Sequence, residues 1–229
     1  YIYDKFGGCD SQEGMGISFA ILFGLADEEK RERILKNVRT SPHGITCVDP
    51  GFQRYSTPDG QGFGRHSGTV WPHIQGFWAS AAAESGNKKI FDREFFAQTS
   101  NVLRSMHFSE IYHPLTGEPY GGRQENYGIC ITEWKAEPRQ TWSATAYIRN
   151  VFFDIIGMKF NENGITFSPI GSDLISKANL LGVRYRNALL NINIQGNGDK
   201  IKEFLINGKP SEPFIPKTAE GELGIEIIL

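Results

Sequence analysis

The spacing of apolar residues changes along this chain, and the change limits what the chain can fold into. Before about residue 158, apolar residues recur at helical spacing or fill whole helix surfaces, as in residues 14–26. After about residue 164 they alternate, as in residues 190–194, which is typical of strands with one buried face. We therefore predict an α+β protein with a helical domain over residues 1–160 and a β module over residues 161–229.

Five helices are expected in the first part, and they alternate in character. Their predicted ranges are 14–26, 28–39, 70–85, 90–106 and 141–158. The first, third and fifth are apolar on nearly every side or rich in small residues, which predicts inner helices that are buried all round. The second and fourth are amphipathic, which predicts outer helices. We expect no strand before residue 150 and no predominance of helix after residue 165.

One carboxylate, Glu110, stands just before a turn that Pro114 and Gly117 form in the segment SEIYHPLTGEPYGG. Proline fixes φ and glycine permits positive φ, so this turn is predicted to be rigid and to hold Glu110 in place. Aromatic residues follow as far as Trp142. Aromatic rings can stack on the apolar faces of a pyranose, while carboxylates, amides and guanidinium groups bind its hydroxyls. The segment suits carbohydrate chemistry, although these residues taken alone favour the alternative that Glu110 is a solvated loop acid.

Two blocks of this sequence resemble motifs of the six-hairpin glycosidases. Residues 110–117 (EIYHPLTG) and 140–144 (QTWSA) resemble the pattern E-x-Y-x-P-x-T-G … W-S/T-A, and residues 65–72 (RHSGTVWP) resemble the H-x-G-x-V-W-P loop. The processing α-glucosidases and mannosylglycerate hydrolases are the most similar group, and the resemblance covers residues 10–170. It implies the C-terminal part of an (α/α) six-hairpin toroid, followed by a small antiparallel β-sandwich module.

The resemblance also implies an activity, namely inverting hydrolysis of an α-linked oligosaccharide or glycoside, with Glu110 as the general base. Inversion needs a second carboxyl group, typically ~6.5 to 9.5 Å from the base. In the family this acid comes from an earlier hairpin, so the upstream part of the same polypeptide is the expected partner. Asp10 is the fallback within the chain. A carbohydrate-binding or catalytically incomplete fragment and a glycoside phosphorylase remain alternatives.

In such a toroid the inner helices run parallel, so the loops that precede them meet at one mouth of the barrel. These loops are residues 1–13, 40–71 and 107–140, and the last exceeds the ~12 to 15 residues usual for a loop without a function. Catalysis is assigned to Glu110. The substrate-binding candidates are Arg65, His66, Trp71, Tyr112, Trp134, Gln140, Trp142 and Glu13.

Several of these residues have an ordinary structural role as an alternative. Trp71 and Trp142 stand at helix starts, where a core position is equally compatible with the sequence. Glu13 precedes a helix, as Asp10 does, and an acid there can cap backbone N–H groups. Glu118 and Glu125 lack the turn that holds Glu110, so they are expected to be solvated.

Composition limits the partners. The net charge of −2 and a pI near 6.3 do not favour a nucleic-acid partner, and no apolar run approaches the ~18 residues of a membrane span. Cys9, Cys47 and Cys130 lack metal-ligand spacing, so we predict buried free thiols, no metal and no cofactor. The chain looks like a fragment or processed product of a soluble protein, for which a periplasmic or extracellular location stays open. The sugar, linkage and anomer are open as well.

Overall fold

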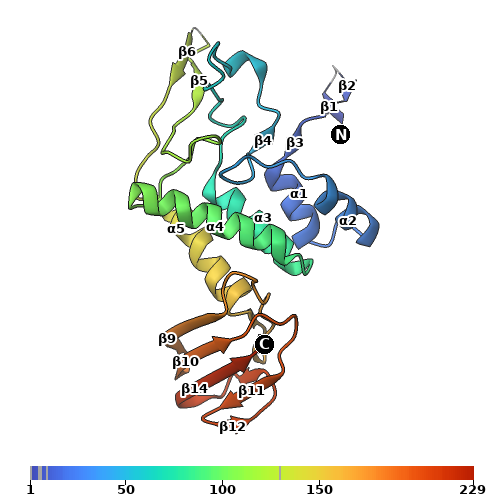
Figure 1. The fold of residues 1–229 in the computed structure, drawn as a ribbon, viewed down its shortest axis with the longest axis vertical. Coiled ribbons are helices and arrows are strands. Elements are labelled where there is room, and N and C mark those ends of the chain that lie inside the picture. Colours follow the sequence, from blue (N-terminus) through green and yellow to red (C-terminus); the bar gives the residue numbers. More distant parts are fainter. Residues whose placement is uncertain (1, 5–6, 9, 129) are drawn as a thin grey trace. The chain divides into compact units, whose positions relative to one another are not determined.

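The computed structural model describes residues 2–4, 7–8, 10–128 and 130–229 and contains similar amounts of helix (31%) and strand (29%). The chain is therefore an α+β protein, as predicted. Its contacts divide it into two compact units (Figure 1). Unit 1 comprises Tyr1–Ala81 and Arg93–Tyr147, and unit 2 comprises Ala82–Asp92 and Ile148–Leu229. The boundary predicted after residue 160 falls within unit 2.

All five predicted helices form. They are α1 (Gly14–Leu22), α2 (Glu28–Asn37), α3 (Pro72–Glu84), α4 (Lys88–Ser105) and α5 (Thr141–Arg149), and α5 continues into the π-helical segment η2 (Asn150–Ile155). Side-chain caps explain the starts of α2 and α4. The Asp27 carboxylate accepts from the Lys30 N–H at 2.9 Å, and the Asn87 amide oxygen accepts from the Ile90 N–H at 3.1 Å. A short 3₁₀ turn, η1 (Gln53–Tyr55), lies in the loop before α3.

Burial confirms the inner character of α3 but not that of α1 or α5. In α5 only Ser143 and Ala146 are buried, and Trp142 and Ile148 are 45% and 52% exposed. Trp78 and Ala82 on α3 are fully buried. The buried residues of α1 are Gly14, Ser18 and Ile21. Beyond them, Phe23 and Leu25 are 69% and 74% exposed, so the prediction that residues 14–26 are buried all round is wrong. The reason is local, since α1 ends at Leu22 and Gly24, with φ of 68°, turns the chain out of the helix.

The apolar stripe predicted over residues 90–106 holds only in the first half of α4. Phe91 and Phe95 are buried, whereas Leu103 and Met106 are 64% and 81% exposed. The buried side chains of the second half are polar, namely Gln98 and Asn101. Their amides donate to the backbone carbonyls of Pro72 and His43, at 3.0 and 3.2 Å. A polar face can therefore pack because each amide has a carbonyl to bind.

Short strands occur before residue 150, contrary to the prediction. They are β1 (Ile2–Asp4), β2 (Gly7–Gly8), β3 (Gln12–Glu13), β4 (Val48–Asp49), β5 (Arg123–Asn126) and β6 (Cys130–Glu133). Strand β3 pairs with β4, and β5 pairs with β6 as a hairpin. Tyr127 and Gly128, with φ of 53° and 70°, turn the chain at the hairpin end. Loops with few helical partners satisfy their backbone groups by pairing with each other.

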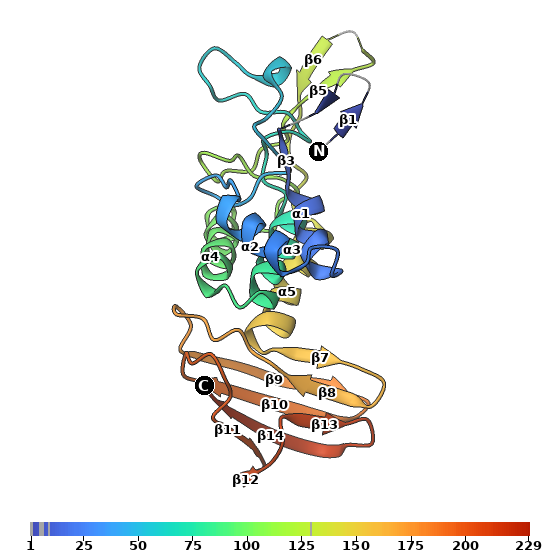
Figure 2. The same cartoon turned by 90° about the vertical axis from the view of Figure 1, so that its right-hand side faces the viewer.

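Unit 2 contains two sheets (Figure 2). The three-stranded sheet has the order β13-β8-β7, and the five-stranded sheet has the order β12-β11-β14-β10-β9. Their strands are β7 (Met158–Phe160), β8 (Gly164–Phe167), β9 (Lys177–Tyr185), β10 (Asn187–Gln195), β11 (Glu203–Ile206), β12 (Lys209–Pro210), β13 (Phe214–Pro216) and β14 (Glu220–Ile228). The strand β10 runs parallel to β14, so the prediction of an all-antiparallel module is wrong for this pair. The chain between them forms β11 to β13 and returns in the same direction, which a tight hairpin cannot do.

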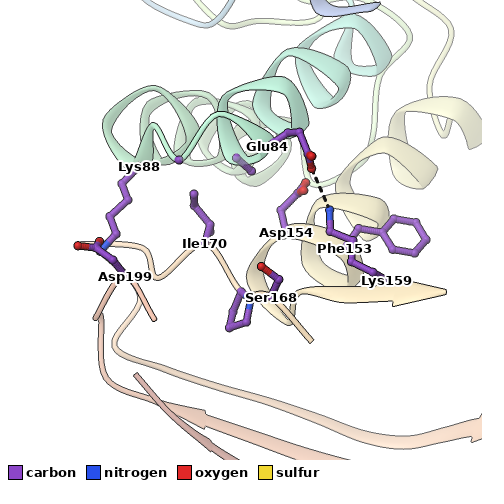
Figure 3. A pocket seen from close by; sticks show the side chains of 11 residues that line it. Glu84, Lys88, Phe153, Asp154, Lys159, Ser168, Ile170 and Asp199 are labelled. Atoms are coloured by element: carbon purple, nitrogen blue, oxygen red, sulfur yellow. Dashed lines mark hydrogen bonds and ion pairs between the residues drawn. The ribbon is translucent and has the colours of Figure 1, made fainter. Parts of the chain in front are cut away.

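The turn between α3 and α4 belongs to unit 2 and is tied to it by charged side chains (Figure 3). Lys159 pairs with Glu84 at 3.4 Å, and Lys88 pairs with Asp199 at 2.5 Å. Together with the buried Asp154, these residues line a cavity of about 320 Å³. Asp154 is itself hydrogen-bonded within η2. The ion pairs that line this cavity therefore hold the turn against the β module.

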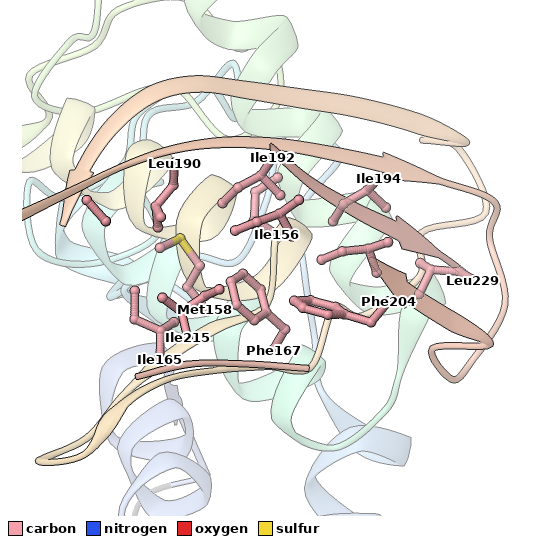
Figure 4. Packing of buried hydrophobic residues seen from close by; sticks show 13 residues of the cluster. Ile156, Met158, Ile165, Phe167, Leu190, Ile192, Ile194, Phe204, Ile215 and Leu229 are labelled. Atoms are coloured by element: carbon pink, nitrogen blue, oxygen red, sulfur yellow. The ribbon is translucent and has the colours of Figure 1, made fainter. Parts of the chain in front are cut away.

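The core of unit 2 lies between its two sheets (Figure 4). Alternate residues of β10, among them Leu190 and Ile192, point to the same side as Ile225 of β14. The facing sheet contributes Ile165 of β8 and Ile215 of β13. All five side chains are 1% exposed or less. The alternation seen in the sequence is therefore the alternation between the core and solvent, as predicted.

Candidate active site

The loops that precede α1, α3 and α5 are hydrogen-bonded to one another in unit 1. Strand β3, before α1, pairs with β4. Val70 and Tyr112 form an antiparallel bridge between the second loop and the third, and Gly64 bridges to Arg123. Figure 1 shows β3, β4, β5 and β6 on one side of these helices. Side chains from three distant segments of sequence are thus brought to one region.

Glu110 and Arg65 form a buried ion pair in this region. The distance from Arg65 Nη2 to Glu110 Oε1 is 2.6 Å, and the two side chains are 17% and 6% exposed. Arg65 also donates through Nη1 to the Gly121 carbonyl at 2.9 Å. Oε2 of Glu110 is 3.4 Å from the Glu137 N–H, at the long limit of a hydrogen bond. The carboxylate therefore has one oxygen firmly held and one nearly free.

The backbone around Glu110 is held on both sides. Its N–H donates to the Glu137 carbonyl at 2.8 Å, and the Val70–Tyr112 bridge follows two residues later. The predicted turn is present, with the Gly117 N–H donating to the His113 carbonyl at 2.9 Å and a φ of 72° at Gly117. A Cβ at Gly117 would lie 2.5 Å from His43 Nδ1, so a larger residue does not fit there. The turn fixes the position of the segment that carries Glu110.

Trp71 lies beside the ion pair, and three further aromatic rings pack around it. The Arg65 guanidinium is 5.6 Å from the centre of the Trp71 ring, within cation–π range. His66 stacks on Trp71 at 4.9 Å with an interplanar angle of 20°. Trp142 lies 6.1 Å from Trp71, and His73 lies 5.5 Å from Trp71 and 5.7 Å from Trp142. Trp71 is buried and Trp142 is 45% exposed, so the cluster has an inner and an accessible side.

The two imidazoles of this cluster are biased toward the neutral form. Partial burial lowers the pKa of His66, and the positive charge of Arg65 lowers it further, against an opposing effect of Glu110. Burial alone lowers the pKa of His73. Sequence reasoning missed His73, although its place directly after Trp71 and Pro72 in the predicted first turn of a helix was available as a signal.

Three of the predicted binding residues make no hydrogen bond or ring contact with the aromatic cluster in the described part of the chain. Tyr112 is fully buried, and its hydroxyl donates to the His107 carbonyl and accepts from the Ser109 N–H. Trp134 follows β6 and is 46% exposed. Gln140 directly precedes α5, and its N–H donates to the Phe108 carbonyl at 2.8 Å. Tyr112 thus stabilises the loop that carries Glu110, and no contact joins Trp134 or Gln140 to that carboxylate in the part of the chain described.

The other predicted acids have different surroundings. Glu13 caps α1 by accepting from the N–H groups of Met15 and Gly16, which is the structural alternative foreseen for it. Asp10 is exposed, and its backbone carbonyl accepts from Arg39. Glu118 is exposed, as expected.

Glu125 is not simply solvated, so that prediction is wrong. It accepts a hydrogen bond from the Tyr55 hydroxyl, which lowers the pKa of the carboxyl, and it pairs with Arg54 at 3.1 Å.

The cysteines match the prediction only in part. Cys47 is buried and free, and burial raises the pKa of its thiol. Cys130 is free but exposed, because β6 is a strand of a two-stranded hairpin with most of its residues in contact with solvent. Cys9 lies outside the described residues. Within residues 10–128 and 130–229, no three His, Cys, Asp or Glu side chains are grouped as metal ligands would be. None of the helices described is long and apolar enough to cross a membrane.

A comparison with known protein families found no match for this chain, and a comparison with curated proteins found no similar sequence.

Proposed function

We propose that this chain carries the general base and part of the sugar-binding surface of an inverting glycoside hydrolase that acts on an α-linked oligosaccharide or glycoside. The observation that carries the proposal is the position of Arg65. This one side chain forms an ion pair with Glu110 and lies over the ring of Trp71. Arg65 therefore connects a fixed carboxylate with an aromatic surface. A glycosidase uses the first group for catalysis and the second to bind its sugar.

Glu110 would act through Oε2. Because Oε1 is bound to Arg65, the nearly free Oε2 is the atom that can take a proton from water. The positive charge of Arg65 compensates the negative charge of the buried carboxylate and fixes its orientation. A base held in one orientation by an ion pair can deprotonate water at a fixed distance from a bound sugar.

The aromatic cluster would bind the sugar. Trp142 presents a half-exposed indole at the start of α5, and His66 covers the buried Trp71 with an exposed ring. Stacking on such rings suits the apolar face of a pyranose. Because Glu110 and Arg65 neutralise each other and both imidazoles favour the neutral form, the surroundings suit an uncharged sugar.

The general acid is the missing component of this proposal. An inverting enzyme needs its two carboxyl groups ~6.5 to 9.5 Å apart so that water fits between base and sugar. Asp10 is exposed and free to supply one, and an upstream segment of the same polypeptide is the other source. The second source corresponds to the six-hairpin toroid, of which helices α1 to α5 would form the C-terminal part.

One observation favours a second candidate, a carbohydrate-binding protein without turnover. The Arg65–Glu110 pair is almost fully buried and already complete, as purely structural ion pairs are. In that case the aromatic cluster would bind sugar, and Glu110 would only hold the loops together.

Following the first-formed products by proton NMR separates the candidates. The protein that contains this chain would be incubated with maltose, with and without phosphate. Hydrolysis with inversion releases β-glucose first, independently of phosphate. Formation of glucose 1-phosphate would instead identify a phosphorylase. Maltose binding without any product would support the binding protein, and neither binding nor turnover across a panel of α-linked disaccharides would refute the proposed function.

A further inference from the structure

His73 occupies a position that packing alone does not explain. It is the second residue of α3, and Trp142 is the second residue of α5. The two rings are 5.7 Å apart and tilted by 49°. On its other side, His73 meets the Trp71 ring edge-on at 5.5 Å. The imidazole therefore lies between the buried and the half-exposed tryptophan of the aromatic cluster.

The two ring nitrogens of His73 differ in their surroundings. Nδ1 is buried and has no hydrogen-bond partner in the described chain. The His73 ring as a whole is only partly buried. Nδ1 is the only one of its two nitrogens that is buried without a partner. No described residue binds Nε2 either, so this nitrogen lies on the accessible side of the ring.

These surroundings select a tautomer. A neutral imidazole has one N–H and one lone pair. Burial lowers the pKa of His73, so the neutral ring is the form present at pH 7. A buried N–H without an acceptor is rarer in proteins than an unsatisfied acceptor, so the proton belongs on Nε2 and the lone pair on Nδ1. His73 thus presents a neutral N–H donor beside the ring of Trp142.

We propose that His73 is a sugar-binding residue, whose Nε2–H donates to a hydroxyl of the sugar that stacks on Trp142. This inference rests on the proposed function and adds a specificity determinant to the same site. A stacking ring binds any pyranose with a suitable apolar face, whereas one fixed donor selects a hydroxyl at one position. The opposing interpretation is that His73 only fills the space between two indoles.

Two variants separate these interpretations. His73→Phe keeps an aromatic ring of similar size but removes the donor, and His73→Gln places an amide N–H near the position of Nε2. Maltose is the probe, and the quenching of tryptophan fluorescence is the readout. We expect His73→Phe to weaken maltose binding about tenfold, as the loss of one neutral hydrogen bond does, and His73→Gln to restore part of it. The fully exposed Tyr127 provides a matched control, since Tyr127→Phe should bind as the wild type does.

A second measurement requires no variant. Nitrogen-15 NMR of the wild-type protein reports the tautomer of His73, and we expect the Nε2–H form without sugar and a shift of the Nε2 resonance on adding maltose. An Nδ1–H tautomer would overturn the inference, as would equal maltose affinity in wild type and His73→Phe. Wild-type protein that binds none of the α-linked disaccharides refutes the proposed function as well. The two failures are therefore distinguishable.

Discussion

Gly76 of α3 and Ala146 of α5 approach so closely that a Cβ on Gly76 would lie 2.7 Å from the Cβ of Ala146. Only a glycine fits at this contact without a shift of its neighbours, which is why α3 and α5 can come together here. One helical turn earlier on each helix stand His73 and Trp142, whose rings meet in the candidate site. The helix contact thus sets the spacing of the aromatic cluster.

Gly76→Ala is expected to push α3 and α5 apart. The added methyl group overpacks the contact and should lower the free energy of unfolding by roughly 1 to 3 kcal/mol. It should also move Trp142 away from His73 and Trp71 and shift the tryptophan emission. Gly224→Ala is a suitable control, because a Cβ there meets only the Asn207 side chain, at 3.5 Å. Chemical denaturation with fluorescence detection measures both effects, and equal stability of wild type and Gly76→Ala would contradict the contact.

Glu110→Gln tests the base directly. The substitution nearly preserves shape but removes the basic lone pair, so hydrolysis should fall by roughly 10² to 10⁴ while sugar binding changes little. The measurement is kcat and KM in the protein that contains this chain and turns over an α-linked substrate. Glu118→Gln is the control on the same loop, because Glu118 is exposed and should be silent.

The outcome separates a base from a binding or structural residue. A rise in KM with kcat spared would make Glu110 a binding residue. Turnover by Glu110→Gln of a glycosyl fluoride of the opposite anomer would support inversion. A folded Glu110→Gln protein with wild-type kcat would exclude Glu110 and leave Glu125 or Glu13 to be tested.

Glu94 of α4 predicts a pH dependence of stability. Its carboxyl group is fully buried, and burial raises its pKa from 4.5 to about 6, although Oε2 accepts from the Ile45 N–H and the Gln75 amide. Oε1 of Glu94 has no partner among the described residues. The folded state therefore binds this proton more tightly than the unfolded state does.

The sign follows from linkage. A raised carboxyl pKa stabilises the fold fully below pH 4.5, and this stabilisation is lost as the pH rises through 6. A carboxyl pKa raised from 4.5 to about 6 corresponds to about 2 kcal/mol. Wild type should therefore lose about that much relative to Glu94→Gln between pH 4.5 and pH 7, in urea denaturation followed by tryptophan fluorescence. The exposed Glu32 serves as control, and parallel pH profiles of wild type and Glu94→Gln would disprove the assignment.

Asp92 should be a stability determinant of unit 2. It is 5% exposed and accepts from the Ser172 hydroxyl and, at 3.0 Å, from the Asp173 N–H. Asp92→Ala leaves these two donors without their acceptor and should cost roughly 1 to 3 kcal/mol. Limited proteolysis should then cut faster near residues 172–176. Asp199→Ala, at a largely exposed position, should have a much smaller effect, and unchanged proteolysis of Asp92→Ala would show that the loop is held otherwise.

The helices could be predicted because their apolar spacing and caps are local signals. Asp27 and the charged first turn after it mark α2 correctly, and the small residues of α3 foretell its close packing. The apolar stripe of α4 was extended too far because Gln98 and Asn101 pack through amide hydrogen bonds, which apolar spacing does not reveal. The parallel pairing of β10 with β14 depends on the path of the intervening chain, which no local pattern encodes.

The sequence predicted several residues of the candidate site but not the contacts between them. Glu110, Arg65 and Trp71 were all named from the sequence, but Arg65 and Glu110 are 45 residues apart, and nothing local shows that they pair. Tyr112 belongs to the motif and was predicted to bind substrate, but its hydroxyl is hydrogen-bonded to the backbone of Ser109 and His107. His73 was missed because its significance comes from the ring of Trp142 on another helix.

The parallel pairing of β10 with β14 has a consequence for the order in which unit 2 folds. The hairpin of β9 and β10 joins segments that are close in sequence, so it can form early. The other edge of β10 stays unpaired until β14, which begins at Glu220, is available. Until that strand has been synthesised, the edge of β10 presents unpaired backbone groups and the apolar side chains of Leu190, Ile192 and Ile194. During synthesis on the ribosome, this interval is when the chain is most exposed to aggregation and to capture by chaperones.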